Sequence, residues 1–307
     1  MRALVITCMY PSAQNPAHGI FVRDQVAALQ RMPDVDVELF AFQSGGMSAY
    51  LRAAHDVRRR YNGVRFDVIH AHFGLTIWPA LALSGAPHAV TLHGTDLVHP
   101  RSRAITVAGL PFLDLVAPVS ARLASLLPRK AVRGEIAVLP CGVDTSRFKR
   151  IDRLQARRAL GLDEACPYLL FPANAARPEK RYDRARAVAG KVPLLVLNDV
   201  DPDQVPLWVN AANAVLVPSE RESFGLAVLE ALACDVPVLA TPVGIAPEVL
   251  EGIDGTYCGP FDVATWRAAL APLLAQTEPR VNGRAAAELY SADRMADRVR
   301  AAWSRLA

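Results

Sequence analysis

The chain has 307 residues, of which 52% are hydrophobic and 21% are charged, and its net charge is +4. At about 100–200 residues per domain, this length predicts two domains. The composition excludes a disordered, collagen-like or coiled-coil chain, and no apolar run reaches the about 18 uncharged residues of a membrane span. Five scattered cysteines without a close pair argue against a disulfide framework or a zinc ribbon, and they favour a cytoplasmic location.

The charge is divided unevenly between the two halves. Residues 1–150 hold 17 Lys+Arg against 10 Asp+Glu, a net of +7, and residues 151–307 have a net of −3. Either each half simply solvates itself, or the first half contacts an anionic partner, such as the inner face of a membrane or a phosphorylated acceptor. Nucleic acid is not expected, because no aromatic residues are interleaved with the basic ones. The residues expected to form this basic face are Arg58, Arg59, Arg60, Arg129, Lys130 and Arg133.

In the first half, short apolar runs alternate with segments of helical period. The pattern predicts strands at residues 3–7, 35–42, 68–71, 89–92 and 115–118. It predicts helices at residues 21–30, 49–61, 77–84 and 120–127. Strands that alternate with helices indicate a parallel sheet covered on both faces.

The pattern changes after residue 138, where a strand and a loop at 138–142 precede a second series. The predicted strands of that series are 168–171, 192–197, 214–217, 236–240 and 256–257. The predicted helices are 152–160, 204–212, 224–233, 246–250 and a last amphipathic helix at 292–306. Two α/β domains joined near residues 143–165 would each present the C-terminal ends of their strands to a shared cleft.

The densest group of polar residues runs from Ser219 to Glu230, between a predicted strand and a predicted helix. Free N–H groups at such a helix start favour an anion such as phosphate, and Gly225 allows close approach to the backbone. Two carboxylates near an anion site, Glu222 and Glu230, are unfavourable unless they face hydroxyls, which a sugar and a ribose supply. The alternative is that Glu222 stabilises the helix dipole and Glu230 is solvated.

Three further segments follow predicted strands or precede a helix. Arg177 and Lys180 could neutralise a diphosphate, or form a solvated basic loop. His93 could hydrogen-bond a hydroxyl, or be a structural histidine. Gly19 could contact phosphate, or form an ordinary turn. The pair His70-Ala71-His72 has H-x-H spacing on one strand face, but no cysteine or carboxylate cluster completes a zinc set, so no metal is expected.

Taken in order, these segments resemble the retaining glycosyltransferases of family 4, which have the GT-B fold, and the resemblance covers nearly the whole chain. The strand at 66–72 resembles the family's "fDvvHaH" segment, and residues 91–96 resemble "tlHGtD". Residues 138–148 resemble the inter-domain "ipNGvD…F", with Cys141 in place of Asn. Residues 210–250 carry the most specific series, in which Glu222 and Glu230 match the family's two-glutamate motif with seven residues between them.

The resemblance implies two facing Rossmann-like doubly wound domains with a cleft between them. The first would span residues 1–147 and hold the acceptor, the second would span 148–290 and hold the donor, and a C-terminal helix at 291–307 would pack back on the first. The implied reaction moves a sugar from a nucleotide-diphosphate sugar to an acceptor, which could be a polysaccharide, a glycolipid or a small molecule. The configuration would be retained, with no metal and no other cofactor.

The resemblance also implies roles for individual residues. His93 and Glu222 would be catalytic, with His93 bonded to the transferred sugar and Glu222 to its hydroxyls. Glu230 would hold the ribose, and the donor would further contact Gly19, Arg177, Lys180, Ser223, Phe224, Gly225 and Leu226.

This sequence departs from the family pattern at several positions. Ala175 stands where the family usually has its diphosphate-binding arginine, which puts the role of Arg177 in doubt. Asn213 replaces a frequent Asp, and Asp235 and Ile245 replace frequent glycines. The second domain is also short. Two alternatives therefore stand beside the transferase: another GT-B nucleotide-sugar enzyme such as an epimerase, and a catalytically silent homologue that binds a nucleotide or a partner.

Overall fold

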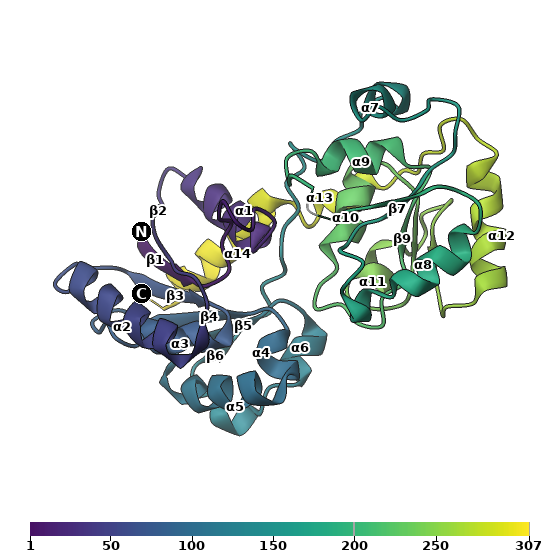
Figure 1. Cartoon of the computed structure of the whole chain (residues 1–307). Helices are drawn as coiled ribbons and strands as arrows, with labels where there is room; N and C mark the ends of the chain where they lie inside the picture. Colours follow the sequence, from purple (N-terminus) through teal and green to yellow (C-terminus); the bar gives the residue numbers. More distant parts are fainter. Residues whose placement is uncertain (199, 307) are drawn as a thin grey trace. The chain divides into compact units, whose positions relative to one another are not determined.

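The computed structural model describes residues 1–198 and 200–306, and it divides the chain into two compact units (Figure 1). Unit 1 contains residues 1–142 together with the C-terminal segment that begins at Ala292, and unit 2 contains Val143–Ser291. Each unit has a parallel sheet and a hydrophobic core of its own. The domain boundary predicted after residue 147 therefore lies a few residues inside unit 2.

Unit 1 is built on a six-stranded parallel sheet with the order β2-β1-β3-β4-β5-β6. Its elements in chain order are β1 (Arg2–Thr7), α1 (Ile20–Gln30), β2 (Asp36–Ala41), α2 (Gly46–Tyr61), β3 (Val68–His72), η1 (Gly74–Thr76), α3 (Ile77–Ala80), β4 (His88–Leu92), α4 (Thr95–Val98), α5 (Pro100–Gly109), η2 (Leu110–Phe112), β5 (Leu115–Pro118), α6 (Ala121–Ser125), η3 (Arg129–Ala131), β6 (Glu135–Ile136) and α14 (Ala292–Ser304).

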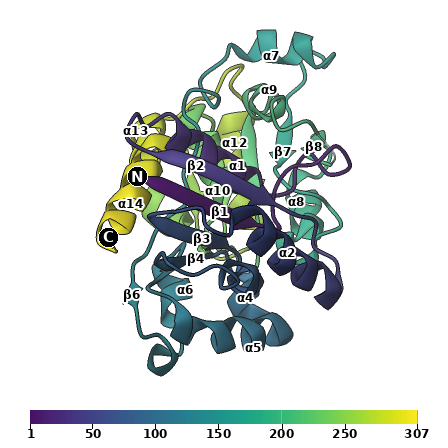
Figure 2. The same cartoon turned by 90° about the vertical axis from the view of Figure 1, so that its left-hand side faces the viewer.

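Helices cover this sheet because its strands are apolar on both sides. Along β1, Ala3 and Val5 point to the side on which α1 and α14 pack, and the alternate residues Leu4 and Ile6 are buried as well. Helices α1 and α14 lie beside each other although they come from opposite ends of the chain (Figure 2). The last helix therefore completes the core of unit 1, and Trp303 is buried in it.

Unit 2 is built on a five-stranded parallel sheet with the order β11-β10-β9-β7-β8. Its elements in chain order are α7 (Arg153–Ala159), β7 (Leu169–Phe171), η4 (Pro178–Lys180), α8 (Tyr182–Ala189), β8 (Leu194–Val196), α9 (Val205–Ala211), β9 (Ala214–Val217), α10 (Leu226–Ala233), β10 (Val238–Ala240), α11 (Ala246–Val249), β11 (Tyr257–Cys258), α12 (Val263–Leu274) and α13 (Arg284–Glu288).

The sheet of unit 2 is covered by α8 and α12 on one face, where Trp266 of α12 is fully buried. Helix α10 packs on β9 and β10 and also contacts α9 and α13. The chain enters and leaves unit 2 along neighbouring paths, because Val143 forms a parallel bridge with Ser291 and its N–H donates to Tyr290 O at 2.9 Å.

Several predicted elements differ from the observed ones. Residues 138–142 were predicted as a strand followed by a loop, and the strand part is wrong: β6 is Glu135–Ile136, although Leu139 N still donates to Pro118 O at 3.1 Å beyond it. The helix predicted at 77–84 ends at Ala80, after which Ala82 and Leu83 donate three residues back instead of four. The predictions omitted α5, α8 and α12 altogether.

Within residues 1–198 and 200–306, none of the helices has both the length and the apolar character that crossing a membrane would require.

Candidate active site

A partly buried ion pair in unit 2 joins the loops that follow β7 and β9. Lys180 Nζ donates to both carboxylate oxygens of Glu222 at 2.7 Å. The two loops are also tied through the backbone, because Glu220 N donates to Glu179 O at 2.9 Å. Neighbouring strands β7 and β9 end at the same edge of the sheet, which explains why residues 42 positions apart in the chain meet here.

The carboxylate of Glu222 is fixed by a second partner. Ser219 Oγ donates to Glu222 Oε1 at 2.8 Å, and Thr241 Oγ1 holds the backbone of this serine by donating to Ser219 O at 2.5 Å. Only 9% of the Glu222 side chain and 16% of the Lys180 side chain are exposed. A partly desolvated ion pair with fixed geometry is stronger than a surface pair, and it presents one positive and one negative group to a ligand.

The turn from Ser223 to Leu226 leads directly into α10. Gly225 is its N-terminal flanking residue with φ 101°, and a glycine has no side chain with which to cap the helix. The turn is held from behind by Ile245, whose N–H donates to Phe224 O at 2.7 Å. Gly244 allows this contact, because a Cβ there would lie 2.3 Å from Phe224 O and 2.8 Å from Glu222 Cβ. Backbone N–H groups at the start of a helix, such as those of α10, suit an anion.

Two other predicted site residues of unit 2 lie outside the Lys180–Glu222 pair. Arg177 is exposed and donates to Glu179 Oε1 through Nε at 2.9 Å and Nη2 at 2.7 Å. Its guanidinium thus interacts with its own loop. Glu230 is half-buried in the second turn of α10.

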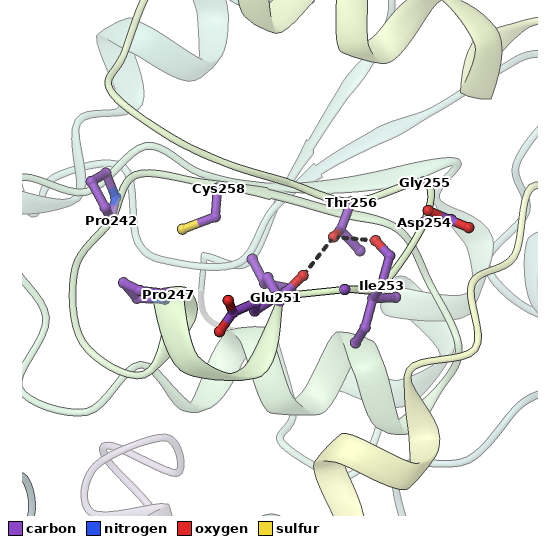
Figure 3. A pocket seen from close by; sticks show the side chains of 10 residues that line it. Pro242, Pro247, Glu251, Ile253, Asp254, Gly255, Thr256 and Cys258 are labelled. Carbon is purple, nitrogen blue, oxygen red and sulfur yellow. Dashed lines mark hydrogen bonds between the residues drawn. The ribbon is translucent and has the colours of Figure 1, made fainter.

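A separate open pocket of about 560 Å³ lies at the edge of unit 2 beside β11 (Figure 3). Thr256 Oγ1 donates to Ile253 O at 2.7 Å within it. The two charged residues that line the pocket, Glu251 and Asp254, are both acidic. Such a lining does not suit a diphosphate, so size alone does not make this pocket the anion site.

In unit 1, His93 follows β4 and is held through its backbone and its ring. Asp96 accepts hydrogen bonds from His93 N at 2.9 Å and Gly94 N at 2.7 Å, which shapes the turn. Burial raises the pKa of Asp96. The ring of Phe21 lies 4.7 Å from that of His93, so the start of α1 is placed beside this histidine.

Gly19 precedes α1 in the left-handed region with φ 70°. A Cβ at this position would lie 2.2 Å from Met9 O. The backbone therefore requires glycine here, independently of any ligand.

Behind His93 lies a stack of imidazoles that includes both histidines of the H-x-H segment. The rings of His70 and His72 are 4.8 Å apart and those of His72 and His93 are 5.4 Å apart. Burial lowers the pKa of His72 to about 3 and holds the pKa values of His70 and His93 well below the ordinary range. All three imidazoles are therefore neutral at pH 7.

The sequence interpretation overlooked three residues that hold these side chains: Ser219, Gln25, whose Nε2 lies 3.3 Å from His72 Nε2, and Trp303, whose Nε1 donates to His70 Nδ1 at 2.8 Å. Ser219 lies inside the motif that was singled out, but the hydrogen bond to Glu222 gave no sequence signal. Gln25 is a polar residue in the apolar stripe of α1, between Val22 and Val26, and that position was a usable signal. Trp303 belongs to the other end of the chain, and no local pattern connects it with β3.

The basic residues expected to form one face do not come together. Arg60 is bonded to Glu38 on β2, at one edge of the sheet of unit 1, and the ion pair is 2.9 Å long. Arg129 and Lys130 form η3, directly before β6 at the opposite edge. The six-stranded sheet separates the two groups, so they make two basic regions instead of one.

Two sequence models of glycosyltransferase families match the chain. The model of glycosyltransferase family 4 matches residues 6–147, and that of glycosyl transferases group 1 matches residues 173–289. The chain is 30% identical to a D-inositol 3-phosphate glycosyltransferase of Mycolicibacterium paratuberculosis, over 88% of this chain and 71% of that protein. It is 28% identical to the protein of the same name from Pseudarthrobacter chlorophenolicus, over 90% of this chain and 78% of the relative.

Solved structures share the fold at low sequence identity. The sucrose-phosphate synthase of Thermosynechococcus elongatus has a TM-score of 0.79 and 17% identity, covering 100% of this chain and 99% of that one. Anabaena HepE in complex with UDP-glucose has a TM-score of 0.73 and 17% identity, covering 99% of this chain and 100% of that one. The predicted fold of two Rossmann-like parallel-sheet domains, the GT-B fold, is confirmed.

Proposed function

Because this chain belongs to the glycosyltransferases of family 4, we propose that it moves a hexose from a nucleotide-diphosphate sugar to an acceptor, with retention of configuration and without a metal ion. The single observation that carries this proposal is the Lys180–Glu222 ion pair in the loops that precede α10. It combines a cation and backbone N–H groups for a diphosphate with a carboxylate for sugar hydroxyls.

In this proposal the ion pair exchanges its partners when the donor binds. The ammonium of Lys180 turns to the diphosphate, together with the N–H groups of Phe224, Gly225 and Leu226. The carboxylate of Glu222, still held by Ser219, accepts from hydroxyls of the transferred sugar. Ser223 adds a donor contact, and Glu230 binds the ribose.

In this proposal the rate is raised mainly by fixed positive charge that stabilises the leaving diphosphate in the transition state. As the bond from the sugar to the diphosphate breaks, negative charge grows on the phosphate oxygens and positive charge on the ring. Lys180 and the N-terminus of α10 stabilise the negative charge on the phosphate oxygens, as a divalent cation does in metal-dependent enzymes. The nearby carboxylate of Glu222 stabilises the positive charge on the sugar ring. Arg177 reaches the diphosphate only if it leaves Glu179.

Retention is proposed to occur by attack of the acceptor on the face that the leaving group vacates. No protein nucleophile is used in this proposal: after Lys180 has turned to the diphosphate, Ser219 still donates to Glu222 Oε1, and the carboxylate accepts from sugar hydroxyls instead of attacking the ring carbon. The acceptor hydroxyl can instead give its proton to the departing phosphate oxygen, so that no protein base is needed.

The proposed donor is supported by a solved structure, and the proposed acceptor is supported by the names of relatives. The Anabaena neighbour was solved with UDP-glucose, which supports a nucleotide sugar as the donor. The curated relatives are named for inositol 3-phosphate, which supports a small polyol as one acceptor class besides a polysaccharide or a glycolipid. We place the acceptor on unit 1, and we keep Gly19 as a donor contact and His93 as the catalytic residue bonded to the transferred sugar.

We further propose a cytoplasmic location, with contact to an anionic membrane through α2 alone. The last turn of this helix carries Arg58, Arg59 and Arg60, and Met47 and Leu51 are exposed on it. Binding to vesicles with anionic lipid that weakens with salt would support the contact. Binding that ignores both salt and lipid charge would contradict it.

The test of the proposed function is turnover of UDP-, GDP-, ADP- and TDP-glucose with polyol, inositol-phosphate and glycolipid acceptors, read by NMR of the product anomer. We expect one donor to transfer with its configuration kept and without magnesium. Glu222→Gln should lower kcat about 100-fold. Glu220→Gln, on the same loop but exposed and paired with Arg181, is the matched control.

Other outcomes of this assay point to other functions. An epimerised nucleotide sugar formed without any acceptor would contradict transfer and favour an epimerase. Nucleotide binding without turnover on any acceptor would favour a silent homologue. An inverted product, or a strict need for magnesium, would contradict the proposed mechanism.

A further inference from the structure

A chain of hydrogen bonds leads from the interior of unit 1 to the ring of His93. Gln25 Nε2 lies 3.3 Å from His72 Nε2, and His72 Nδ1 lies 3.1 Å from His93 Nε2. Gln25 and His72 are buried, whereas His93 is only half-buried. This row of hydrogen bonds therefore begins in the core and ends at the least buried of the three residues.

The ring of His72, in the middle of this row of hydrogen bonds, packs against the ring of His70. Trp303 Nε1 donates to His70 Nδ1 at 2.8 Å, and His70 Nε2 lies 2.8 Å from Thr91 Oγ1. An indole N–H can only donate, so a neutral His70 carries its proton on Nε2. The His70 ring stacks on His72 with an interplanar angle of 13°, which leaves His72 little freedom to turn.

The same pairing of donors with acceptors fixes the proton on His93. A neutral imidazole has one donor nitrogen and one acceptor nitrogen. The Gln25 amide N–H donates to His72 Nε2, so His72 carries its proton on Nδ1 and donates it to His93 Nε2. His93 must then hold its own proton on Nδ1. Within residues 1–198 and 200–306, no hydrogen bond to the protein uses that Nδ1.

We propose that Gln25 and His72 are positioning residues that hold His93 as the neutral Nδ1–H tautomer, with this N–H left to donate to a hydroxyl of the transferred sugar. The sugar contact rests on the proposed function, whereas the tautomer is a property of the free protein. We call this row of hydrogen bonds, from Gln25 through His72 to His93, the relay. Because the relay leaves His93 Nδ1 as a donor, the sugar hydroxyl accepts from it, and the proton of that hydroxyl can bond to another group.

The first test reads the tautomer directly, with no ligand. The full chain is labelled with 15N-histidine, and long-range proton–nitrogen NMR correlations assign the protonated nitrogen of each buried ring. We expect His93 in the Nδ1–H form, unchanged between pH 5.5 and 8.5. In Gln25→Leu the amide donor is gone, and we expect both tautomers of His93. A wild-type protein with the proton on Nε2, or a tautomer insensitive to Gln25→Leu, would overturn the relay.

A control separates the relay from general disturbance of the core. Trp303→Phe removes the buried hydrogen bond to His70 but leaves Gln25, His72 and His93 in place. We expect this variant to unfold at a lower temperature while His93 keeps the Nδ1–H form. If Trp303→Phe mixed the tautomers as much as Gln25→Leu does, the assignment to Gln25 would be wrong.

The second test compares two variants of equal size and opposite hydrogen-bond polarity. In His72→Asn the amide can still donate to His93 Nε2, whereas in His72→Asp the carboxylate can only accept from it. With UDP-glucose as the donor probe, we expect kcat/KM to be about tenfold lower for Asp than for Asn. The Kd for UDP should be equal, because the relay faces the sugar and not the nucleotide.

The two tests can contradict the sugar contact and the tautomer of His93 independently of each other. Equal kcat/KM values for His72→Asn and His72→Asp would overturn the sugar contact even where NMR shows the tautomer as expected. No turnover of any nucleotide sugar by the wild-type protein would instead contradict the proposed function, and the NMR result would still decide whether the relay exists.

Discussion

At the scale of single residues, Lys180 and Arg177 are close in the chain but differ in their surroundings. The Lys180 side chain is 16% exposed and bonded to Glu222, whereas that of Arg177 is 57% exposed and bonded to Glu179. A charge in a desolvated site acts more strongly on a ligand than one in water. We therefore expect Lys180→Met to weaken binding of a nucleoside diphosphate about 100-fold, and Arg177→Met less than threefold.

Titration calorimetry with UDP, GDP, ADP and TDP measures both variants. Equal losses for the two substitutions would show that Arg177 takes over the role of the family's usual arginine at position 175. A loss for Arg177→Met alone would contradict the placement of the diphosphate at Lys180.

The buried imidazoles make stability depend on pH. In the unfolded chain a histidine has a pKa of about 6.5, whereas burial lowers the pKa of folded His72 to about 3 and lowers those of His70 and His93 as well. Below about pH 6.5 the unfolded chain thus binds protons that the folded chain does not. Stability is full above this pH and falls as the pH decreases, by about 1.4 kcal/mol per pH unit for each histidine.

Denaturant unfolding between pH 5.5 and 7.5 measures this slope. Asp96, whose pKa is raised by burial, contributes with the opposite sign between its unfolded and folded pKa values. His70→Gln should reduce the slope by about a third. A slope in His70→Gln equal to that of the wild type would contradict neutral buried histidines.

At the scale of elements, the turn before α10 depends on its packing against the loop after β10. Gly244 has φ 62°, and a Cβ there would overlap Phe224 O, whereas Gly161 has φ 65° and nothing within 4 Å. Both Gly→Ala variants incur the cost of a left-handed residue, about 1–2 kcal/mol. Only Gly244→Ala should also displace Glu222 and lower turnover by tenfold or more.

Thermal unfolding and turnover of the two alanine variants separate these effects. We expect similar kcat for Gly161→Ala and the wild type. Unchanged kcat in Gly244→Ala would mean that the turn adjusts, and that Glu222 does not need the position the structure gives it.

The elements differ in how far the sequence predicted them. Buried parallel strands such as β5 and β9 were predicted to the residue, because they are short apolar runs between breaks. Helix α12 was missed since it is apolar nearly all round and contains Pro272, which hides the helical period. Its capping residue Asp262, which accepts from Thr265 N at 2.8 Å, was a usable start signal.

At the scale of the whole molecule, the fold class followed from the alternation of strands and helices, and the family from the Glu222–Glu230 series. The hydrogen-bond partners within the site did not follow. Lys180 meets Glu222 only because β7 and β9 are neighbours in the sheet. Trp303 meets His70 only because α14 returns to unit 1. Contacts across such sequence separations depend on tertiary packing, which a local pattern does not encode.

The most direct measurement of the central claim, a donor site in unit 2 that works without metal, is thermal unfolding with UDP, GDP, ADP and TDP, each with and without magnesium. A nucleotide at about 100 times its Kd adds roughly 2.7 kcal/mol, a rise of about 5 °C for a chain of this length. We predict that one nucleotide raises the midpoint equally with and without magnesium, and that Lys180→Met, with binding about 100-fold weaker, lowers the rise to about 1 °C or less. A rise that needs magnesium, that survives Lys180→Met in full, or that no nucleotide produces would contradict the claim.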